Sequence, residues 1–495
     1  MIFEFLFALP AISIIIGAIY LMLLSHNKNI TLNDFNHISL FFLTIALIFE
    51  IVILDKNMSG YLFVDIFGHN FKLDAFATIF DLMFTAGAIL TLLINSDYFK
   101  SRTYFRGEYF ALILFSVFGM MMLSHANELV TAFIALEIAS LSVYALVGFH
   151  KTKTTSSEAM MKYMILGSMT GAFFMLGTAL IYGAVGSTSL ENIAIYVNST
   201  QVEDMNLLIV GASFLLVTIM FKIGAVPFHS WVVDVYYGAP YPITMFMAST
   251  FKIAIFAIAL RLYITDFEPI NYIWTEMLQT ITILTLIGGS FLAISQTKVK
   301  RMLAGSSLVH SGYLLIGLSS IGLGSELGAA AIMFYLIAYF LSAAGSFGIL
   351  SFIGSQSKRD MSYDDFKGFA RRRPYMALMM SIFMLSLAGF PSTIGFLGKF
   401  YIFTSAIESG QILLAGLGII TAFISVYYYF KLIAMMYFYP DDSLQKKFPI
   451  DASTIMIALM AIIVILGGIG TSLISFFPSA DTFIESAKLA ISSLK

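Results

Sequence analysis

The chain has 495 residues, of which 59% are apolar and only 11% are charged, and its mean hydropathy is +0.90. This composition lies far outside the range of soluble globular domains and indicates a membrane protein. The net charge of −2 gives no indication of a nucleic-acid partner, and the lack of cysteine excludes disulfides, thiolate metal sites and Fe–S ligation by this chain.

The apolar segments are about 20 residues long, which predicts transmembrane helices and not the roughly ten-residue strands of a membrane barrel. The first segment carries Glu4 and no basic stretch before it, so it is predicted to be a retained span and not a signal peptide. Fourteen spans are predicted, near 2–24, 38–54, 73–95, 109–125, 127–149, 159–185, 206–238, 241–264, 276–295, 301–322, 326–353, 374–408, 410–438 and 451–477. Between the second and third, residues 61–74 alternate apolar and polar around Gly68, which predicts a small hairpin.

Two of these spans are too long for one straight crossing, and each has a proline near its middle. Pro227 lies in span 206–238 and Pro391 in span 374–408. Proline removes an amide donor and clashes with the preceding turn, so each span is expected to be broken.

Each broken span is the fourth member of a group of five, spans 4–8 and spans 9–13. Because five is odd, consecutive groups must be inverted relative to one another, which is a transporter architecture. The predicted fold is therefore an all-α polytopic membrane protein of about 14 transmembrane helices with two inverted five-helix repeats, each containing a broken helix. The predicted divisions are an N-terminal three-helix segment (1–108), the first repeat (109–264), the second, inverted repeat (275–438), and a C-terminal helix and tail (439–495).

Basic residues gather in the loops that follow odd-numbered spans, for example at 100–106, 151–153, 298–301 and 358–373. Loops on the other side, with both tails, hold only Lys56, Lys72, Lys488 and Lys495. The basic loops are therefore expected to be cytoplasmic. Both termini of this multi-pass chain are then expected on the outer (periplasmic) side of the cell inner membrane.

Five charged residues interrupt apolar runs: Glu137, Lys162, Lys222, Lys252 and Lys399. An ionised side chain at the centre of a bilayer costs about 2.5–3.5 kcal/mol even on the lenient scale, so charge at that depth indicates an ion or proton pathway. A single buried lysine can be structural, but three midspan lysines and a midspan glutamate, two of the lysines beside predicted helix breaks, have little structural rationale.

A partly desolvated lysine can exchange its proton near neutral pH, and a nearby carboxylate favours its charged form. A Glu–Lys pair whose separation changes is thus a proton switch. His310 is predicted to relay protons between Lys252 and Lys399, because imidazole both donates and accepts. For Lys431 a structural role is weighted equally, and Asp81 and Asp234 can be interpreted as ties between helix ends.

Sequence motifs then identify a resemblance that covers nearly the whole chain in order. The motifs are PFHSWVVDVYYGAPYPIT (227–244), KRMLAGSSLVHSGY (300–313) and LAGFPSTIGFLGKFYIF (387–403), together with the glutamate of span 5 and the Lys-Tyr pair of span 6. They resemble the antiporter-like, proton-translocating subunits of NADH-quinone oxidoreductase (respiratory complex I). Val233 replaces the proline that larger relatives carry before the motif aspartate, and Lys399 stands where subunit M usually has glutamate.

The resemblance implies roles for the buried charges. Glu137 and Lys222 would form the modulating pair, Lys252 would be the connecting lysine and Lys399 the exit-side lysine, with Lys162 auxiliary. No cofactor would be bound by this chain, since NADH (or another donor) and quinone would be used elsewhere in the complex. The implied partners are the bilayer, protons and other membrane subunits of the M, L, K, A, J and H types.

Three alternatives stay open at this point. The chain could be the D-type subunit of a multisubunit Na⁺/H⁺ antiporter or a related membrane-bound hydrogenase subunit, a standalone secondary transporter, or a structural membrane scaffold with inert charges. The standalone transporter is disfavoured because the sequence indicates a series of titratable groups and no wide substrate site.

Overall fold

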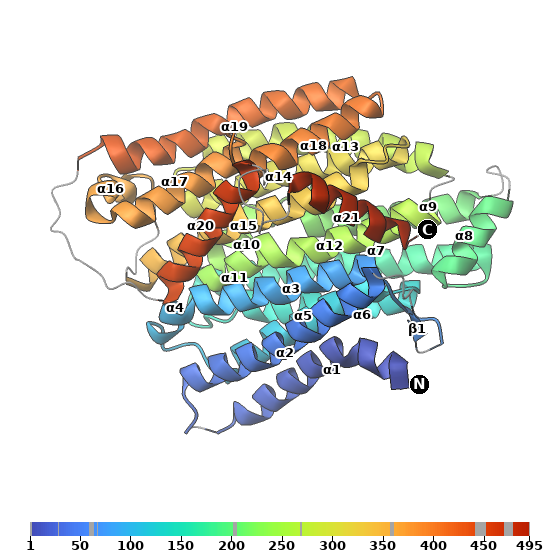
Figure 1. The fold of residues 1–495 in the computed structure, drawn as a ribbon, viewed down its shortest axis with the longest axis horizontal. Coiled ribbons are helices and arrows are strands. Elements are labelled where there is room, and N and C mark those ends of the chain that lie inside the picture. The colour runs from blue at the N-terminus through green and yellow to red at the C-terminus, as the bar shows by residue number, and fades with distance from the viewer. Residues whose placement is uncertain are drawn as a thin grey trace.

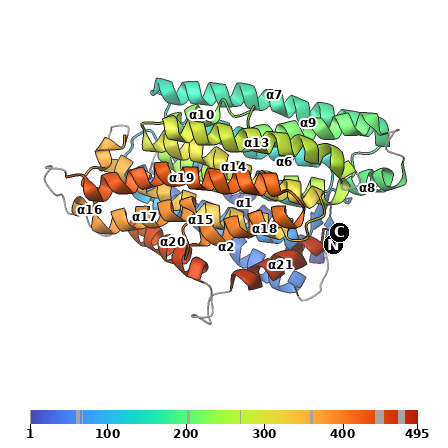
Figure 2. The ribbon, with the colours of Figure 1, turned by 90° about the horizontal axis from the view of Figure 1, so that it is seen from above.

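The computed structural model describes residues 2–27, 29–58, 64–66, 68–200, 205–267, 270–356, 361–440, 452–469 and 479–494. Long helices run side by side along the longest axis of the molecule (Figures 1 and 2). Both termini, the strand β1 (Val64–Ile66) and the helix α8 (Leu190–Ser199) lie at one end, which we call the hairpin end. The short helix α16 (Phe369–Arg372) lies at the opposite end.

Twelve helices in the described part of the chain are long and apolar enough to cross a membrane. The chain is therefore an all-α, multi-pass membrane protein, as the sequence predicts. The exact count of fourteen spans, the inverted repeat and the division into segments stay predictions.

The N-terminal part consists of α1 (Ile2–Leu24), α2 (Leu32–Met58), the hairpin β1 and β2 (Phe71–Leu73), α3 (Ala75–Ile94) and α4 (Ser96–Lys100). The two strands pair antiparallel, which confirms the predicted hairpin. Its turn includes Gly68 and His69, both with positive φ (+72° and +69°), a conformation in which glycine carries no penalty.

The middle of the chain forms α5 (Gly107–His125), α6 (Leu129–Val147), α7 (Thr154–Val185), α8, α9 (Asn206–Ile223) and α10 (Val232–Gly238). One further crossing changes its helix type along its length: α11 (Tyr241–Phe246), the π-helix η2 (Met247–Phe251), α12 (Lys252–Arg261) and the π-helix η3 (Leu262–Asp266).

The C-terminal part begins with α13 (Asn271–Ser295), α14 (Val299–Gly322) and α15 (Gly328–Gln356). A 3₁₀ turn, η5 (Asp364–Phe366), and α16 then precede the second broken span, α17 (Pro374–Ala388) and α18 (Ile394–Glu408). The chain continues as α19 (Ile412–Phe438), α20 (Ala452–Ile469) and α21 (Ala480–Ser492).

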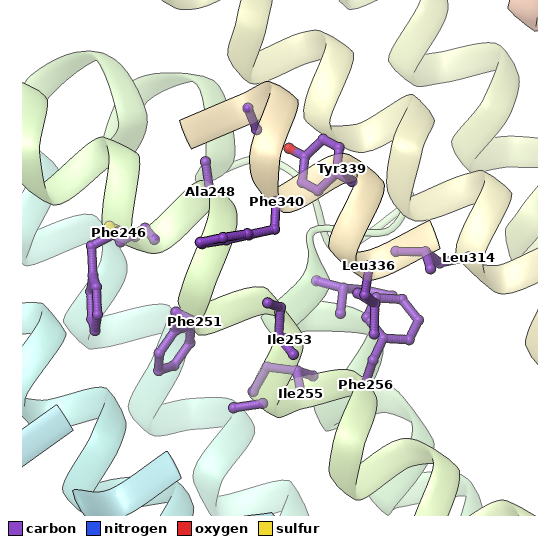
Figure 3. Close-up of a cluster of buried hydrophobic side chains, with 14 of the residues drawn as sticks. Phe246, Ala248, Phe251, Ile253, Ile255, Phe256, Leu314, Leu336, Tyr339 and Phe340 are labelled. Carbon is purple, nitrogen blue, oxygen red and sulfur yellow. The ribbon is translucent and has the colours of Figure 1, made fainter. Parts of the chain in front are cut away.

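The crossing α11–η2–α12 and helix α14 form the centre of the molecule, since both are buried along their whole apolar windows. Figure 3 shows Leu336 and Phe340 of α15 beside the apolar side chains of η2 and α12. A helix buried on all sides can hold charged groups away from both lipid and water, which makes these two elements the place to look for function.

Glycine allows the closest helix contacts. A Cβ at Gly119 of α5 would lie 2.5 Å from the backbone nitrogen of Ala139 of α6, and one at Gly305 of α14 would lie 2.8 Å from the Cα of Ala293 of α13. Small residues at such contacts let membrane helices approach backbone to backbone.

Candidate functional site

Lys222 lies in the last turn of α9, directly before the first helix break. Gly224, with φ +76°, turns the chain out of the helix, and residues 224–231 are not α-helical before α10 begins. The Phe221 carbonyl accepts from the Trp231 indole N–H over 3.1 Å and from the Gly224 N–H over 3.0 Å. The break is thus held by specific hydrogen bonds, and it leaves a lysine at a helix end inside the protein.

The Lys222 side chain contacts one face of α6. It is 4% exposed, and its Nζ donates to Ser140 Oγ (2.7 Å) and to Tyr144 OH (2.9 Å). Glu137 precedes Ser140 by three positions and so shares that face. Its Oε1 is buried without a hydrogen-bond partner, and within the described residues no ion pair joins Glu137 to Lys222. The carboxyl group therefore lies about one turn from the lysine contacts without bonding the ammonium.

Lys252 begins α12, immediately after the π-helix η2, and π-helical turns frequently mark functional sites. Its Nζ donates to Ser307 O (2.9 Å), Ser307 Oγ (2.6 Å) and Ser311 Oγ (2.9 Å) on α14. The Ser311 hydroxyl in turn bonds the carbonyl of Ile223, which follows Lys222 in the chain, over 2.9 Å. Ser311 therefore connects Lys252 to the backbone next to Lys222.

His310 lies on α14 between two tyrosines. Its Nδ1 is 2.6 Å from Tyr335 OH on α15, and its Nε2 is 3.0 Å from Tyr429 OH on α19. Tyr429 also bonds the Ser306 hydroxyl. Hydroxyl groups both donate and accept, so each ring nitrogen has a partner that suits either tautomer.

Lys399 of α18 reaches back across the second helix break, residues 389–393. Its Nζ donates to the carbonyls of Leu387 (2.8 Å) and Ala388 (2.9 Å), the last residues of α17. Carbonyls at a helix C-terminus carry partial negative charge, so they stabilise an ammonium without a carboxylate. The ammonium also lies 5.0 Å from the ring centre of Tyr313 on α14.

Helix α14 lies between Lys252 and Lys399: Ser307 and Ser311 accept from Lys252, and Tyr313 lies beside Lys399. The His310 ring packs against Tyr313 and against Tyr339 of α15, whose ring faces the Lys252 ammonium at 5.1 Å. The four α14 side chains belong to the fully buried central helix. We call the buried polar groups around Lys222, Lys252, His310 and Lys399, near the two helix breaks, the polar zone. That protons pass along it stays a prediction from the sequence.

One expectation about a charged residue was wrong, the buried position of Lys162. Lys162 is not buried: its side chain is 42% exposed and pairs with Glu158 (2.7 Å) and Asp234 (2.9 Å). Asp234 ties α10 to α7 through this pair, in agreement with a structural role. Lys431, for which a structural role was weighted equally, is exposed on α19 and lies over the ring of Tyr363. A midspan sequence position does not reveal which side of its helix faces the core.

Sequence reasoning did not identify the hydroxyl groups that bind the buried lysines and His310, namely Ser140, Tyr144, Ser307, Ser311, Tyr335 and Tyr429. Helical spacing was the available signal, because Ser140 and Tyr144 stand three and seven positions after Glu137. No group of three His, Asp or Glu side chains is arranged to hold a metal ion within the residues that the structure describes.

Residues 126–425 match the family model described as "NADH:quinone oxidoreductase/Mrp antiporter, TM". This match spans more than half of the chain and includes both helix breaks and the buried Lys222, Lys252 and Lys399. The chain belongs to this family. The NADH-quinone oxidoreductase subunit N of Trichlorobacter lovleyi is 40% identical over 379 residues, 77% of each chain. The subunit N of Ruthia magnifica subsp. Calyptogena magnifica is 34% identical over 467 residues, 93% of this chain and 94% of its own.

Solved structures show the same fold. A chain of respiratory complex I from Thermus thermophilus with bound aureothin superposes with a TM-score of 0.78 at 28% identity, covering 94% of this chain and 98% of that one. A chain of the Mrp complex from Dietzia sp. superposes with a TM-score of 0.83 at 18% identity, covering 99% of this chain and 97% of that one. At this identity the similarity shows the fold alone.

Proposed function

We propose that this chain is the proton-translocating membrane subunit N of an NADH-quinone oxidoreductase. The observation that carries the proposal is the polar zone around Lys222, Lys252, His310 and Lys399. Each of its three lysines is 4% exposed, and within the part of the chain that the structure describes their hydrogen-bond partners are hydroxyls and carbonyls alone. The relatives named subunit N, at 34–40% identity over most of the chain, support this subunit over the Na⁺/H⁺ antiporter alternative.

In this proposal a lysine bound by neutral groups can both gain and lose its proton. A lysine ion-paired to a carboxylate would hold its proton too tightly to pass it on. When the Glu137 carboxylate approaches Lys222, it favours the protonated form of the lysine. When the carboxylate moves away, Lys222 can release its proton. Ser311 and His310 with its tyrosines supply hydroxyl and imidazole groups between the lysines, and Lys399 holds the exit-side position.

The redox chemistry belongs to other subunits in this proposal, so the enzyme is the whole translocase and this chain binds neither NADH nor quinone. Its partners are the neighbouring membrane subunits, of the M, L, K, A, J and H types, and its location is the cell inner membrane. The hairpin end, with both termini, faces the outer side.

The test compares Lys222→Met and Lys399→Met with Lys431→Met in membrane vesicles. Lys431 also interrupts an apolar helix but is exposed on α19, so it is a matched control. We expect both buried-lysine variants to assemble and to lose about tenfold or more of quinone turnover and ΔpH formation, since positioned proton-transfer groups contribute about 10²–10⁴-fold. The Lys431→Met variant should keep most of its quinone turnover and ΔpH formation. Wild-type turnover and ΔpH in the two buried-lysine variants would contradict the proposal.

A further inference from the structure

A second set of buried ionisable groups lies at the hairpin end, apart from the lysines. Glu50 near the end of α2 is 1% exposed, and Asp81 of α3 is 4% exposed. His125 ends α5 with a side chain that is 12% exposed. These three residues come from three helices of the N-terminal half, and the proposed relay uses none of them.

Asp81 and His125 share a proton. His125 Nδ1 lies 3.1 Å from the backbone carbonyl of Lys72, which can only accept, so this nitrogen carries a hydrogen. His125 Nε2 lies 2.7 Å from Asp81 Oδ2, and a second hydrogen must stand between them. The pair is therefore either imidazolium with carboxylate or imidazole with carboxylic acid, and it is neutral in both forms. Ser124 Oγ donates to the other Asp81 oxygen over 2.8 Å.

Glu50 has no such partner. Its Oε2 accepts from Thr85 Oγ1 over 2.7 Å, while its Oε1 is buried without a hydrogen-bond partner within the described residues. A buried carboxylate with one hydroxyl donor is costly, so an additional proton at Glu50 stabilises the set.

The other charged groups around this set are already balanced or exposed. Asp74 pairs with Arg261 of α12 through both carboxylate oxygens, at 3.1 and 2.9 Å. Asp55 and Lys56, further along α2, are exposed. Helices α11, α15 and α20, which pack against α3, carry no charged residue within their described ranges. Helix α21 also packs against α3, and its charged residues Asp481, Glu485 and Lys488 are exposed. The Lys72 ammonium donates to the Leu494 carbonyl over 3.4 Å.

Asp81 and His125 also line a cavity of about 240 Å³, whose remaining wall is largely apolar and comes from α1, β2 and α5. Water in such a cavity needs polar partners, and Asp81 and His125 are the two polar residues of this lining. The cavity also touches Phe71 and Leu73 of the hairpin strand β2, and Glu50 is not among its lining residues.

We propose that Glu50, Asp81 and His125 form a proton-binding site that exchanges protons with the hairpin-end side of the membrane through the cavity beside α1. The ligand is a proton, and the site lies outside the row of buried lysines. The role of this site in pumping rests on the proposed function. Proton binding at the site does not depend on that function.

Two measurements on the assembled complex test this site. The infrared spectrum of the Glu50→Gln variant is subtracted from that of the wild type at neutral pH. The difference should contain the band of a protonated carboxyl group, which Glu50 contributes. That band should be missing from wild type minus Glu485→Gln, a matched change at an exposed glutamate of α21. Glutamine is isosteric and can still accept the Thr85 hydrogen bond, so the Glu50 variant keeps its packing. If the difference spectrum contains only the bands of an ionised carboxylate, Glu50 carries no proton and the proposal is overturned.

The second measurement uses inside-out vesicles, whose lumen corresponds to the outer side. With the external pH fixed, the dependence of pumping on lumenal pH should shift by about one unit or more in Glu50→Gln and Asp81→Asn, and should stay unchanged in Glu485→Gln. An unchanged midpoint, or an equal loss at every lumenal pH, would overturn the site's part in pumping. If the Asp81→Asn variant does not assemble, the lumenal-pH dependence of the Glu50→Gln variant alone decides whether the site takes part in pumping. The infrared measurement detects proton binding without pumping. Its outcome is therefore independent of the lysine variants, which test the proposed pumping function.

Discussion

The buried ion pair between Arg261 and Asp74 offers a quantitative test of the packing of the N-terminal half. The Arg261 side chain is 3% exposed and that of Asp74 is 0% exposed. The guanidinium binds both carboxylate oxygens at 3.1 and 2.9 Å, and its Nε donates to the Ser124 carbonyl at 2.9 Å. Asp74 is also the N-cap of α3, accepting from the Ala77 N–H at 2.8 Å. This pair therefore joins α12, α3 and the end of α5.

Arg261→Met would leave the Asp74 carboxylate buried with one backbone donor and would free the Ser124 carbonyl. Removing one partner of a buried pair costs about 3–5 kcal/mol, because the remaining charge is uncompensated. Asp74→Asn should cost a similar amount by stranding the guanidinium, although asparagine keeps the cap, since Asn and Asp cap helices equally well. The double variant buries no unpaired charge, so its cost should be well below the sum of the single costs.

The assay is a double-variant cycle on the chain in detergent, with the free energy of unfolding measured by denaturant titration. We expect a coupling of about 2 kcal/mol or more between the two sites, within the range for residues in direct contact. A loss below about 1 kcal/mol in Arg261→Met, or additive single effects, would refute the reasoning that this buried charge depends on its partner.

Three further predictions follow from particular residues. Glu137→Gln should lower turnover and ΔpH formation more than Glu137→Asp, because the proposed action on Lys222 is electrostatic, and equal activity of Gln and wild type would refute it. Gly119→Val should reduce the amount of assembled protein, because the new Cβ would meet the α6 backbone at 2.5 Å, whereas normal assembly would show that α5 and α6 can separate. The chain has no cysteine, so single-cysteine labelling can test orientation: in intact cells an impermeant maleimide should label Glu485→Cys and not Asp364→Cys, and the reverse pattern would invert the topology.

The sequence alone was sufficient for the membrane fold, because long apolar runs have only one stable backbone solution in a bilayer. It also located both helix breaks, since proline restricts the backbone locally whatever surrounds it. Charge in an apolar run identified five candidate residues, which include the three central lysines, because an ionised side chain in a bilayer is costly. These properties depend on a residue and its chain neighbours, and a single sequence contains them fully.

The tertiary structure decided which charged residues face the core and what they contact. Lys162 and Lys399 look alike in the sequence, yet one forms surface ion pairs and the other binds the carbonyls of a broken helix. The Asp81–His125 pair depends on how α3 packs against α5, across 44 positions of the chain. Membrane helices with nearly uniform hydrophobicity carry little signal for their rotation, so only packing between distant segments fixes which side chains meet.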